Sequence, residues 1–238
     1  LILFCFLRDL NGKEQLITKG NYDVMDIAQV DEKAGIVYFL ASPEDATSAY
    51  LYSAKLDGSS VQRVTPASQY GTHNYSVSPD SKYAYHSFSN YYTPPVAEFI
   101  SMADHKGLSQ QRVDQALQRA DSAGSNVSFF KVKTADGVEM DGWMQKPYKM
   151  EAGKKYPLVF YVYTEPAGQT VKNTYGVSGN WLYNGDMAAD GYIYVSLDNR
   201  GTPAPKGRAW RKSIYRKIGQ INIHDQGMAA RELLKLPF

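Results

Sequence analysis

Short alternating or apolar stretches, separated by turn residues, fill the first hundred positions and predict antiparallel strands. Asn11-Gly12 and Asp57-Gly58 each stand between two such stretches, and both dipeptides tolerate the positive φ angles of tight hairpins. Further strand-like runs follow at 35–40 and 83–88, with a weaker echo at 96–100 that closes at Gly107. This order recurs with a period in the forties, which indicates β-propeller blades. A β-sandwich with coincidental turns is the less favoured alternative.

The chain opens on the apolar run 1–7, which we interpret as a buried strand whose partners lie upstream of Leu1, with Cys5 as a buried structural thiol. The run is far too short for a bilayer span, which takes roughly 20 apolar residues. Blades bury their faces only by stacking on neighbours. We therefore expect further blades before Leu1.

The pattern changes after residue 107 and predicts a second kind of domain. The expected elements are a linker helix at 108–123, a hairpin of strands 127–132 and 142–147, buried strands at 156–163 and 191–198, and helices at 181–189 and 221–234. Strands and helices that alternate after an antiparallel start indicate an α/β sheet with parallel crossovers. The predicted domains are thus 1–107 (last propeller blades), 108–123 (helical linker) and 124–238 (start of an α/β domain).

Composition narrows the function classes. The 238 residues are 43% hydrophobic and 21% charged, with a net charge of +2, so there is no electrostatic case for a nucleic-acid partner. The 19 tyrosines suit half-buried strands. A single cysteine excludes an internal disulfide, and no Cys/His cluster has zinc-like spacing. We expect no metal and no cofactor.

A serine nucleophile is not evident. The elbow Gly-x-Ser-x-Gly does not occur, and Ser178 lies in a loop-like context rather than on a strand-to-helix turn. His224 stands at the start of the last predicted helix with no elbow before it, so it does not fit the order Ser, Asp, His. The neighbouring Asp225 does not face it, since adjacent helix residues point about 100° apart.

Specific motifs appear in the second half, in Tyr161-Val162-Tyr163-Thr164-Glu165-Pro166-Ala167-Gly168-Gln169, in Leu197-Asp198-Asn199-Arg200-Gly201-Thr202, and in the stretch from Gly207 to Gln226. This ordered set resembles the catalytic domain of the dipeptidyl peptidase IV group of prolyl oligopeptidase-type serine peptidases. The segments 16–24 and 75–80 resemble the last propeller blades of that group. The resemblance implies the C-terminal blades of a β-propeller followed by the N-terminal part of an α/β-hydrolase domain.

The resemblance also implies site residues. Tyr163 matches a tyrosine that donates to the oxyanion, and one such donor is typically worth a few kcal/mol. Arg200 matches an arginine that organises loops, and Asp225 is expected to be a supporting acid. The Ser, Asp and His triad is expected beyond Phe238, and the acidic pair that grips the substrate's amino group before Leu1. Thr164 and Glu165 depart from the family's small residues and add bulk and charge.

The implied function is removal of Xaa-Pro or Xaa-Ala dipeptides from the free amino terminus of peptides, by acyl-serine chemistry. The chain alone, taken as a fragment, is expected to be inactive and prone to aggregate. The alternative is a non-catalytic binding protein of the same architecture that has lost the nucleophile. The sequence is compatible with a homodimer or a monomer of the whole protein, and it predicts no membrane segment. The resemblance favours a periplasmic, secreted or cell-surface location.

Overall fold

The computed structural model describes residues 4–108, 110–123 and 125–238, and the chain divides into two compact units. The first unit groups the chain up to Ala123 with 173–175 and 205–208. The second unit holds the remaining residues from 124 to 238. The domain boundaries predicted from the sequence, at residues 107 and 123, stay a prediction, because this division follows contacts between residues. Among the described residues, no helix combines the length and the apolar character that a bilayer crossing needs.

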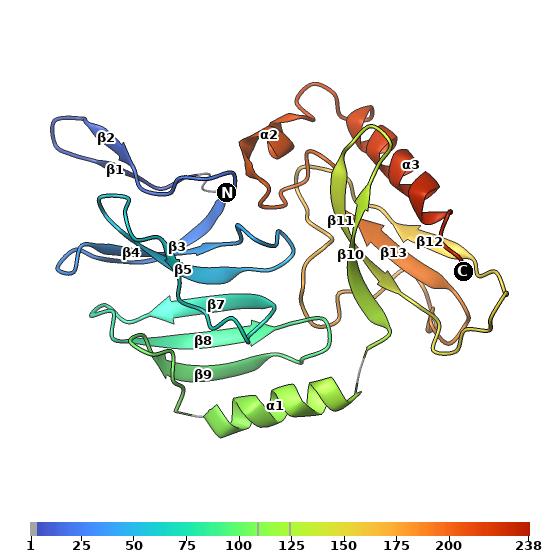
Figure 1. The fold of residues 1–238 in the computed structure, drawn as a ribbon, viewed down its shortest axis with the longest axis horizontal. Helices are drawn as coiled ribbons and strands as arrows, with labels where there is room; N and C mark the ends of the chain where they lie inside the picture. Colours follow the sequence, from blue (N-terminus) through green and yellow to red (C-terminus); the bar gives the residue numbers. More distant parts are fainter. Residues whose placement is uncertain (1–3, 109, 124) are drawn as a thin grey trace. The chain divides into compact units, whose positions relative to one another are not determined.

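The first unit consists of antiparallel sheets, as its sequence predicts (Figure 1). Two glycines that close hairpins, Gly12 and Gly58, have φ angles of +83° and +79°, which glycine adopts without a steric penalty. Sheet order follows chain order throughout, which is the meander of propeller blades. The sheets are β1 (Phe6–Arg8) with β2 (Glu14–Leu16); β3 (Val24–Asp31), β4 (Ile36–Ala41), β5 (Tyr50–Lys55) and β6 (Gln62–Arg63); and β7 (Thr72–Val77), β8 (Tyr83–Ser89) and β9 (Val96–Ser101).

Helix α1 (Gln110–Ala123) follows β9 and forms where the helical spacing predicts it. Val113 is buried against Phe88 and Val96, so α1 closes the apolar cluster at this end of the β7–β9 sheet. In Figure 1 the helix lies along β9. The elements within this unit are thus joined by the burial of apolar side chains.

The prediction of a buried first strand is wrong for the part that the structure describes. β1 pairs only with β2, and Phe6 and Leu7 are exposed. Cys5, just before β1, is buried together with Ile17 in the cluster around β3–β5, as expected for a structural thiol. Burial raises the pKa of the Cys5 thiol. Residues 1–3 of the predicted strand lie outside the described residues.

A chain of polar side chains crosses the buried face of the β7–β9 sheet. His73 Nδ1 and His86 Nε2 are 2.8 Å apart, and the rings stack nearly parallel. His86 Nδ1 lies 3.4 Å from Glu98 Oε1, and the side chains of both residues are almost completely buried. The hydroxyl of Tyr75 contacts His105 Nε2 at 2.8 Å. Three of the four histidines of the sequence therefore lie in one cluster, which sequence reasoning did not foresee.

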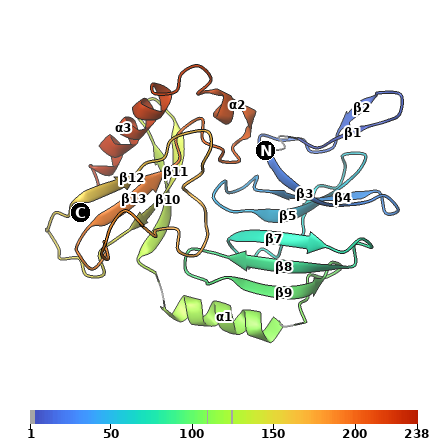
Figure 2. The ribbon, with the colours of Figure 1, turned by 180° about the vertical axis from the view of Figure 1, so that it is seen from behind.

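The second unit is built on one mixed sheet with the order β10-β11-β13-β12. β10 and β11 form the predicted antiparallel hairpin, and β12 and β13 are parallel. Helix α3 packs Ala229 and Leu233 against Met140 and Val195 of the sheet (Figure 2). The bounds are β10 (Val127–Lys133), β11 (Glu139–Gln145), β12 (Leu158–Tyr161), β13 (Ile193–Leu197) and α3 (Ile221–Leu233). The short helix α2 (Gly207–Lys212) begins with two residues that are grouped with the first unit.

The helix predicted at 181–189 is wrong, because this segment forms a series of turns. Asp186 Oδ1 accepts hydrogen bonds from the backbone N–H groups of Ala188 and Ala189. Aspartate competes for backbone donors in this way and favours turns over helix. The helix predicted at 221–234 is confirmed as α3.

Candidate active site

The carboxyl ends of β12 and β13 lie at the same edge of the sheet, because the two strands are neighbours and run parallel. The segment 162–172 follows β12, and the segment 198–202 follows β13. Ligands of open α/β sheets bind outside the carboxyl ends of the strands. Tyr163 falls in the first of these segments, so this edge is the candidate active site.

Asp198, directly after β13, anchors the segment that carries Tyr163. Its Oδ1 accepts hydrogen bonds from the Thr170 N–H (3.0 Å) and hydroxyl (3.1 Å), and its Oδ2 accepts one from the Val171 N–H (3.3 Å). Trp143 of β11 donates its indole N–H to the Thr170 carbonyl at 3.0 Å. Burial raises the pKa of Asp198 to about 6, although the donated hydrogen bonds favour its charged form. A buried carboxyl group thus ties this segment to the sheet.

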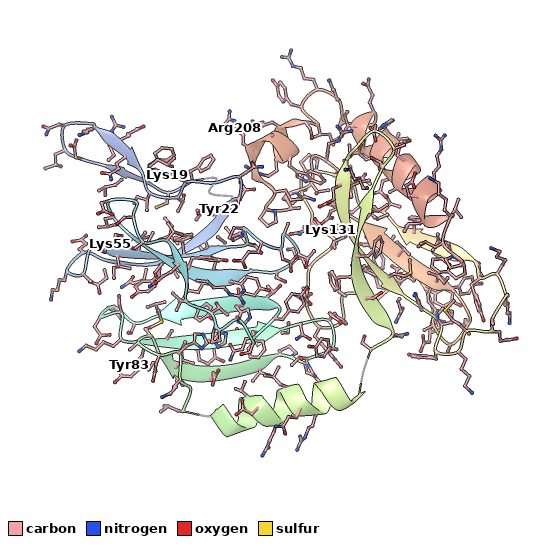
Figure 3. All side chains as sticks on the ribbon, viewed as in Figure 1. Lys19, Tyr22, Lys55, Tyr83, Lys131 and Arg208 are labelled. Atoms are coloured by element: carbon pink, nitrogen blue, oxygen red, sulfur yellow. The ribbon has the colours of Figure 1, made fainter. Side chains whose placement is uncertain are left out.

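The hairpin of β10 and β11 adds charge at this edge. Asp141 of β11 is a smaller cause of the raised pKa of Asp198. Lys131 of β10, labelled in Figure 3, places its ammonium 3.1 Å from Glu139 and 4.0 Å from Asp141. These pairs balance the acidic side chains of the hairpin.

Arg200 and Asp225 form the tightest ion pair at the edge. The Asp225 carboxylate is fully buried and accepts bonds from the Arg200 backbone N–H (3.0 Å), Nε (3.0 Å) and Nη2 (2.6 Å). The hydrogen bond from Arg200 to Asp225 raises the pKa of the guanidinium. These contacts confirm that Arg200 organises a loop and that Asp225 supports it. His224 instead places Nε2 3.0 Å from Asp136 Oδ2, so His224 and Asp225 do not form a pair.

Tyr163 lies two residues past the end of β12 and is 45% exposed. Its ring lies over Gly168, where an added Cβ would come within 2.7 Å of the ring atom Cε1. Among the described residues, no side chain or backbone group hydrogen-bonds its hydroxyl. Chemically, this is a phenol O–H on the segment that follows β12, available to donate to a negatively charged oxygen. Its role as oxyanion donor stays a prediction.

Neither Ser178 nor His224, the two other residues considered for catalysis, contacts Tyr163 among the hydrogen bonds of the described residues. Ser178 lies in a turn, as its context predicts. No three His, Cys, Asp or Glu side chains are grouped to hold a metal ion in the part of the chain that the structure describes. What the edge offers is therefore a hydrogen-bond donor on a well-anchored segment.

Sequence reasoning missed three residues that hold this segment in place: Asn199, Asn222 and Gln226. Gln226 donates to the Leu197 carbonyl (2.8 Å) and to Asn199 Oδ1 (3.2 Å). Asn199 and Asn222 both donate to Thr164. The sequence shows that these are polar residues directly after a buried strand or on the first turns of a helix, but it does not show which residues they contact.

Blade-like antiparallel sheets followed in sequence by an α/β sheet define the architecture of propeller-containing hydrolases. Residues 3–95 match the family model of the dipeptidyl peptidase IV N-terminal region, and residues 184–238 match that of the prolyl oligopeptidase family. Both matches, and the structural match described below, support the resemblance to the dipeptidyl peptidase IV group of the prolyl oligopeptidase family.

Individual relatives agree with this assignment. The chain is 30% identical over 234 residues to a protein of Arthroderma otae named "Probable dipeptidyl-aminopeptidase B", covering 96% of the chain and 25% of the relative. It is 30% identical to the dipeptidyl-aminopeptidase B of Aspergillus niger, covering 91% and 24%. The crystal structure of Porphyromonas gingivalis dipeptidyl peptidase 4 matches with a TM-score of 0.83 and 27% identity, over 99% of this chain and 33% of that one. The chain thus spans about a quarter of the length of these curated relatives.

Proposed function

We propose that the whole protein is a serine exopeptidase that removes Xaa-Pro or Xaa-Ala dipeptides from the free amino terminus of peptides. Tyr163 supplies one hydrogen bond to the oxyanion of the tetrahedral intermediate, and a serine outside the sequence described here is the nucleophile. The main support for this proposal is that the Tyr163 side chain is exposed at the carboxyl edge of the parallel strands β12 and β13. The similarity to a probable dipeptidyl-aminopeptidase B and to a dipeptidyl peptidase 4 supports the release of dipeptides.

The chemistry follows from where the charge develops. When a nucleophile attacks the scissile carbonyl, its oxygen becomes negatively charged and needs donors that are already in place. A phenol hydroxyl without a partner among the described residues loses no existing protein hydrogen bond when it donates to this oxygen. The anchored segment 162–172 restricts the motion of Tyr163, which reduces the reorganisation needed at the moment of reaction.

The test measures kcat and KM of the whole protein on Ala-Pro and Ala-Ala chromogenic substrates. Tyr163→Phe removes only the hydroxyl, and we expect kcat to fall about 100-fold or more with little change in KM, as for other oxyanion donors. Tyr83→Phe is the matched control, because Tyr83 is an exposed tyrosine on β8 (Figure 3). An unchanged kcat for Tyr163→Phe would refute the oxyanion role.

A fluorophosphonate probe separates the peptidase from the binding-protein alternative. The probe labels an activated serine covalently, so the proposal predicts one labelled serine and dipeptide release by the whole protein. Peptide binding without labelling or turnover would establish the binding protein instead. No observation at the site favours that alternative.

The proposal includes a periplasmic, secreted or cell-surface location, which the family resemblance favours, and a peptide with a free amino terminus as the substrate. Acetylating the amino terminus of the substrate should abolish cleavage. Light scattering of the purified whole protein decides between a monomer and a homodimer.

A further inference from the structure

Thr164, the residue after Tyr163, has a backbone conformation that threonine rarely adopts. Its φ angle is +60°, in the left-handed region. The Cβ of an L-residue clashes with the backbone there, and a β-branched side chain makes the conformation rarer still. Strained residues of this kind persist only where the surrounding structure holds them, and they cluster at functional sites.

Two asparagines from distant parts of the chain hold Thr164. Asn222, on the first turn of α3, donates its Nδ2–H to Thr164 Oγ1 at 3.1 Å. Asn199, after β13, donates its Nδ2–H to the Thr164 carbonyl at 3.3 Å. Both asparagines are buried. The side chain and the backbone of Thr164 are thus fixed from two separate elements.

The orientation of the Asn222 side chain is itself fixed. Its Oδ1 accepts a hydrogen bond from the Gly219 backbone N–H at 2.8 Å. The amide nitrogen must therefore face Thr164 Oγ1, which leaves that oxygen as the acceptor. The Thr164 side chain, which adds bulk compared with the small residue of the family, is therefore held by a hydrogen bond from Asn222 of α3.

The consequence falls on Tyr163. A change of φ at Thr164 rotates the chain on one side of Tyr163 relative to the other, while the Tyr163 ring stays confined by Gly168 on one face. The direction of the phenol hydroxyl therefore depends on Thr164 keeping its left-handed conformation. Donors must lie within tenths of an ångström of their productive position to stabilise an oxyanion.

We propose that Asn222 is a positioning residue for catalysis, which acts by holding Thr164 left-handed and thereby aiming the Tyr163 hydroxyl. This inference rests on the proposed function of Tyr163. Asn222 acts on the substrate only through Thr164 and Tyr163. Loss of the Asn222 amide therefore weakens transition-state stabilisation more than substrate binding.

The experiment is a double-mutant cycle in the whole protein with Asn222→Ala and Thr164→Gly. We expect Asn222→Ala to lower kcat about tenfold, which corresponds to about 1.4 kcal/mol of transition-state stabilisation, with KM changed by less than about twofold. Glycine adopts the left-handed conformation without support. In the presence of Thr164→Gly, the effect of Asn222→Ala on kcat should therefore shrink to less than about twofold.

Asn126→Ala is the matched control, because Asn126 also donates a side-chain amide hydrogen bond, here to the Lys146 carbonyl, but lies directly before β10; it should leave kcat unchanged. An equal loss of kcat from Asn222→Ala with and without Thr164→Gly would overturn the inference. So would a variant that melts at lower temperature while keeping its kcat.

An activity-independent readout separates this inference from the proposed function. Amide hydrogen exchange of residues 162–168 should accelerate in Asn222→Ala, because the support of Thr164 is lost. Unchanged exchange would overturn the positioning role even if Tyr163→Phe shows the oxyanion donor to be correct. Accelerated exchange with an unaffected Tyr163→Phe enzyme would show that Asn222 holds Thr164 in place, but it would refute the role of Tyr163 and with it the catalytic role of Asn222.

Discussion

The buried chain of His73, His86 and Glu98 fixes where its protons lie. The Gln69 carbonyl, 3.1 Å from His73 Nε2, can only accept a hydrogen bond, so Nε2 carries the proton and Nδ1 of neutral His73 accepts. His86 must then donate from Nε2 to His73 Nδ1. The His86 Nδ1 atom is left as an acceptor that faces Glu98 Oε1. A fully neutral chain therefore needs a proton on Glu98.

Burial acts on all three groups in the direction of neutrality. It is the largest cause that lowers the pKa of His73 to about 3 and that of His86 to about 2, from an ordinary value of 6.5; His105 contributes to both shifts, and His73 to that of His86. Burial also raises the pKa of Glu98, and the charge of Asp114 is a second, smaller cause in the same direction. Arg63 lowers the pKa of His73 as a minor cause. The neutral state of the chain is thus the state that the fold selects.

The two kinds of shift have opposite effects on stability. A histidine with a depressed pKa destabilises the fold as pH falls below 6.5, because only the unfolded chain then takes up the proton. Glu98 has a raised pKa, so its contribution is present at low pH and is lost as pH rises from its unfolded value of 4.5 through its folded pKa. Acidification therefore costs stability through His73 and His86, and Glu98 offsets part of the loss.

The magnitude for one histidine depends on the unfolded pKa alone, as long as the folded pKa lies well below the measured range. Between pH 7 and pH 5 an unfolded histidine with a pKa of 6.5 goes from mostly neutral to mostly charged, while buried His73 stays neutral. The buried, neutral His73 therefore lowers the free energy of unfolding by about 2 kcal/mol more at pH 5 than at pH 7.

His73→Gln removes this titration and keeps a donor and an acceptor at the position. We expect the variant to be less stable than the parent at pH 7, and the difference to narrow by about 2 kcal/mol at pH 5. Because Glu98 and His86 are common to both proteins, their contributions largely cancel in the comparison. The readout is hydrogen exchange of the β7–β9 amides, which reports the local opening free energy of this sheet.

His224→Gln is the matched control, since His224 is half-exposed and lies in the second unit. It should leave the opening free energy of β7–β9 unchanged at both pH values. A stability difference between His73→Gln and the parent that is the same at pH 7 and pH 5 would refute the reasoning, because it would mean that folded His73 takes up its proton as readily as the unfolded chain.

Two further predictions concern the second unit. Gly201→Ala should destabilise the protein by about 3 kcal/mol in thermal melts, because φ is +94° and the new Cβ would lie 2.4 Å from Ile214 Cβ; the control Gly227→Ala, in open space on α3, should stabilise by about 0.5–1 kcal/mol. The raised pKa of Asp198 means that its protonated form stabilises the fold below about pH 4, and that this contribution is lost as pH rises through about 6. Asp198→Asn should therefore remove about 1 kcal/mol of the loss in stability between pH 5 and pH 7, and identical pH profiles for both proteins would contradict the assignment.

Local patterns were sufficient for most of the fold. The continuous run around β13 predicts a strand buried on both faces, and all five of its residues are buried. The same pattern at β12 gives a strand of intermediate burial, since β12 lies at the edge of the described sheet. Patterns failed where one side chain redirects the backbone, as Asp186 does in the turns at 181–189. They also failed where apolar residues have no neighbour to cover them, as for Phe6 of β1.

The histidine cluster was partly readable from the sequence. His86 stands at an alternate position with Ala84 and Phe88 along β8, and all three are buried. The period of two therefore places His86 on the core face. Its contacts with His73 and Glu98 depend on the register of three strands, which one sequence does not reveal.

The site was readable only through the family motifs, because its supports are long-range. Thr164 taken alone is an unfavourable residue for a left-handed position, and local rules would place glycine there. The contact with Asn222, 58 positions further along the chain, supplies the missing reason. A residue that breaks a local rule at a functional site is expected to have its compensation elsewhere in the fold. Thr164 and Asn222 are therefore best understood as one unit: loss of the Asn222 amide should be tolerated when residue 164 is glycine, and not when it is threonine.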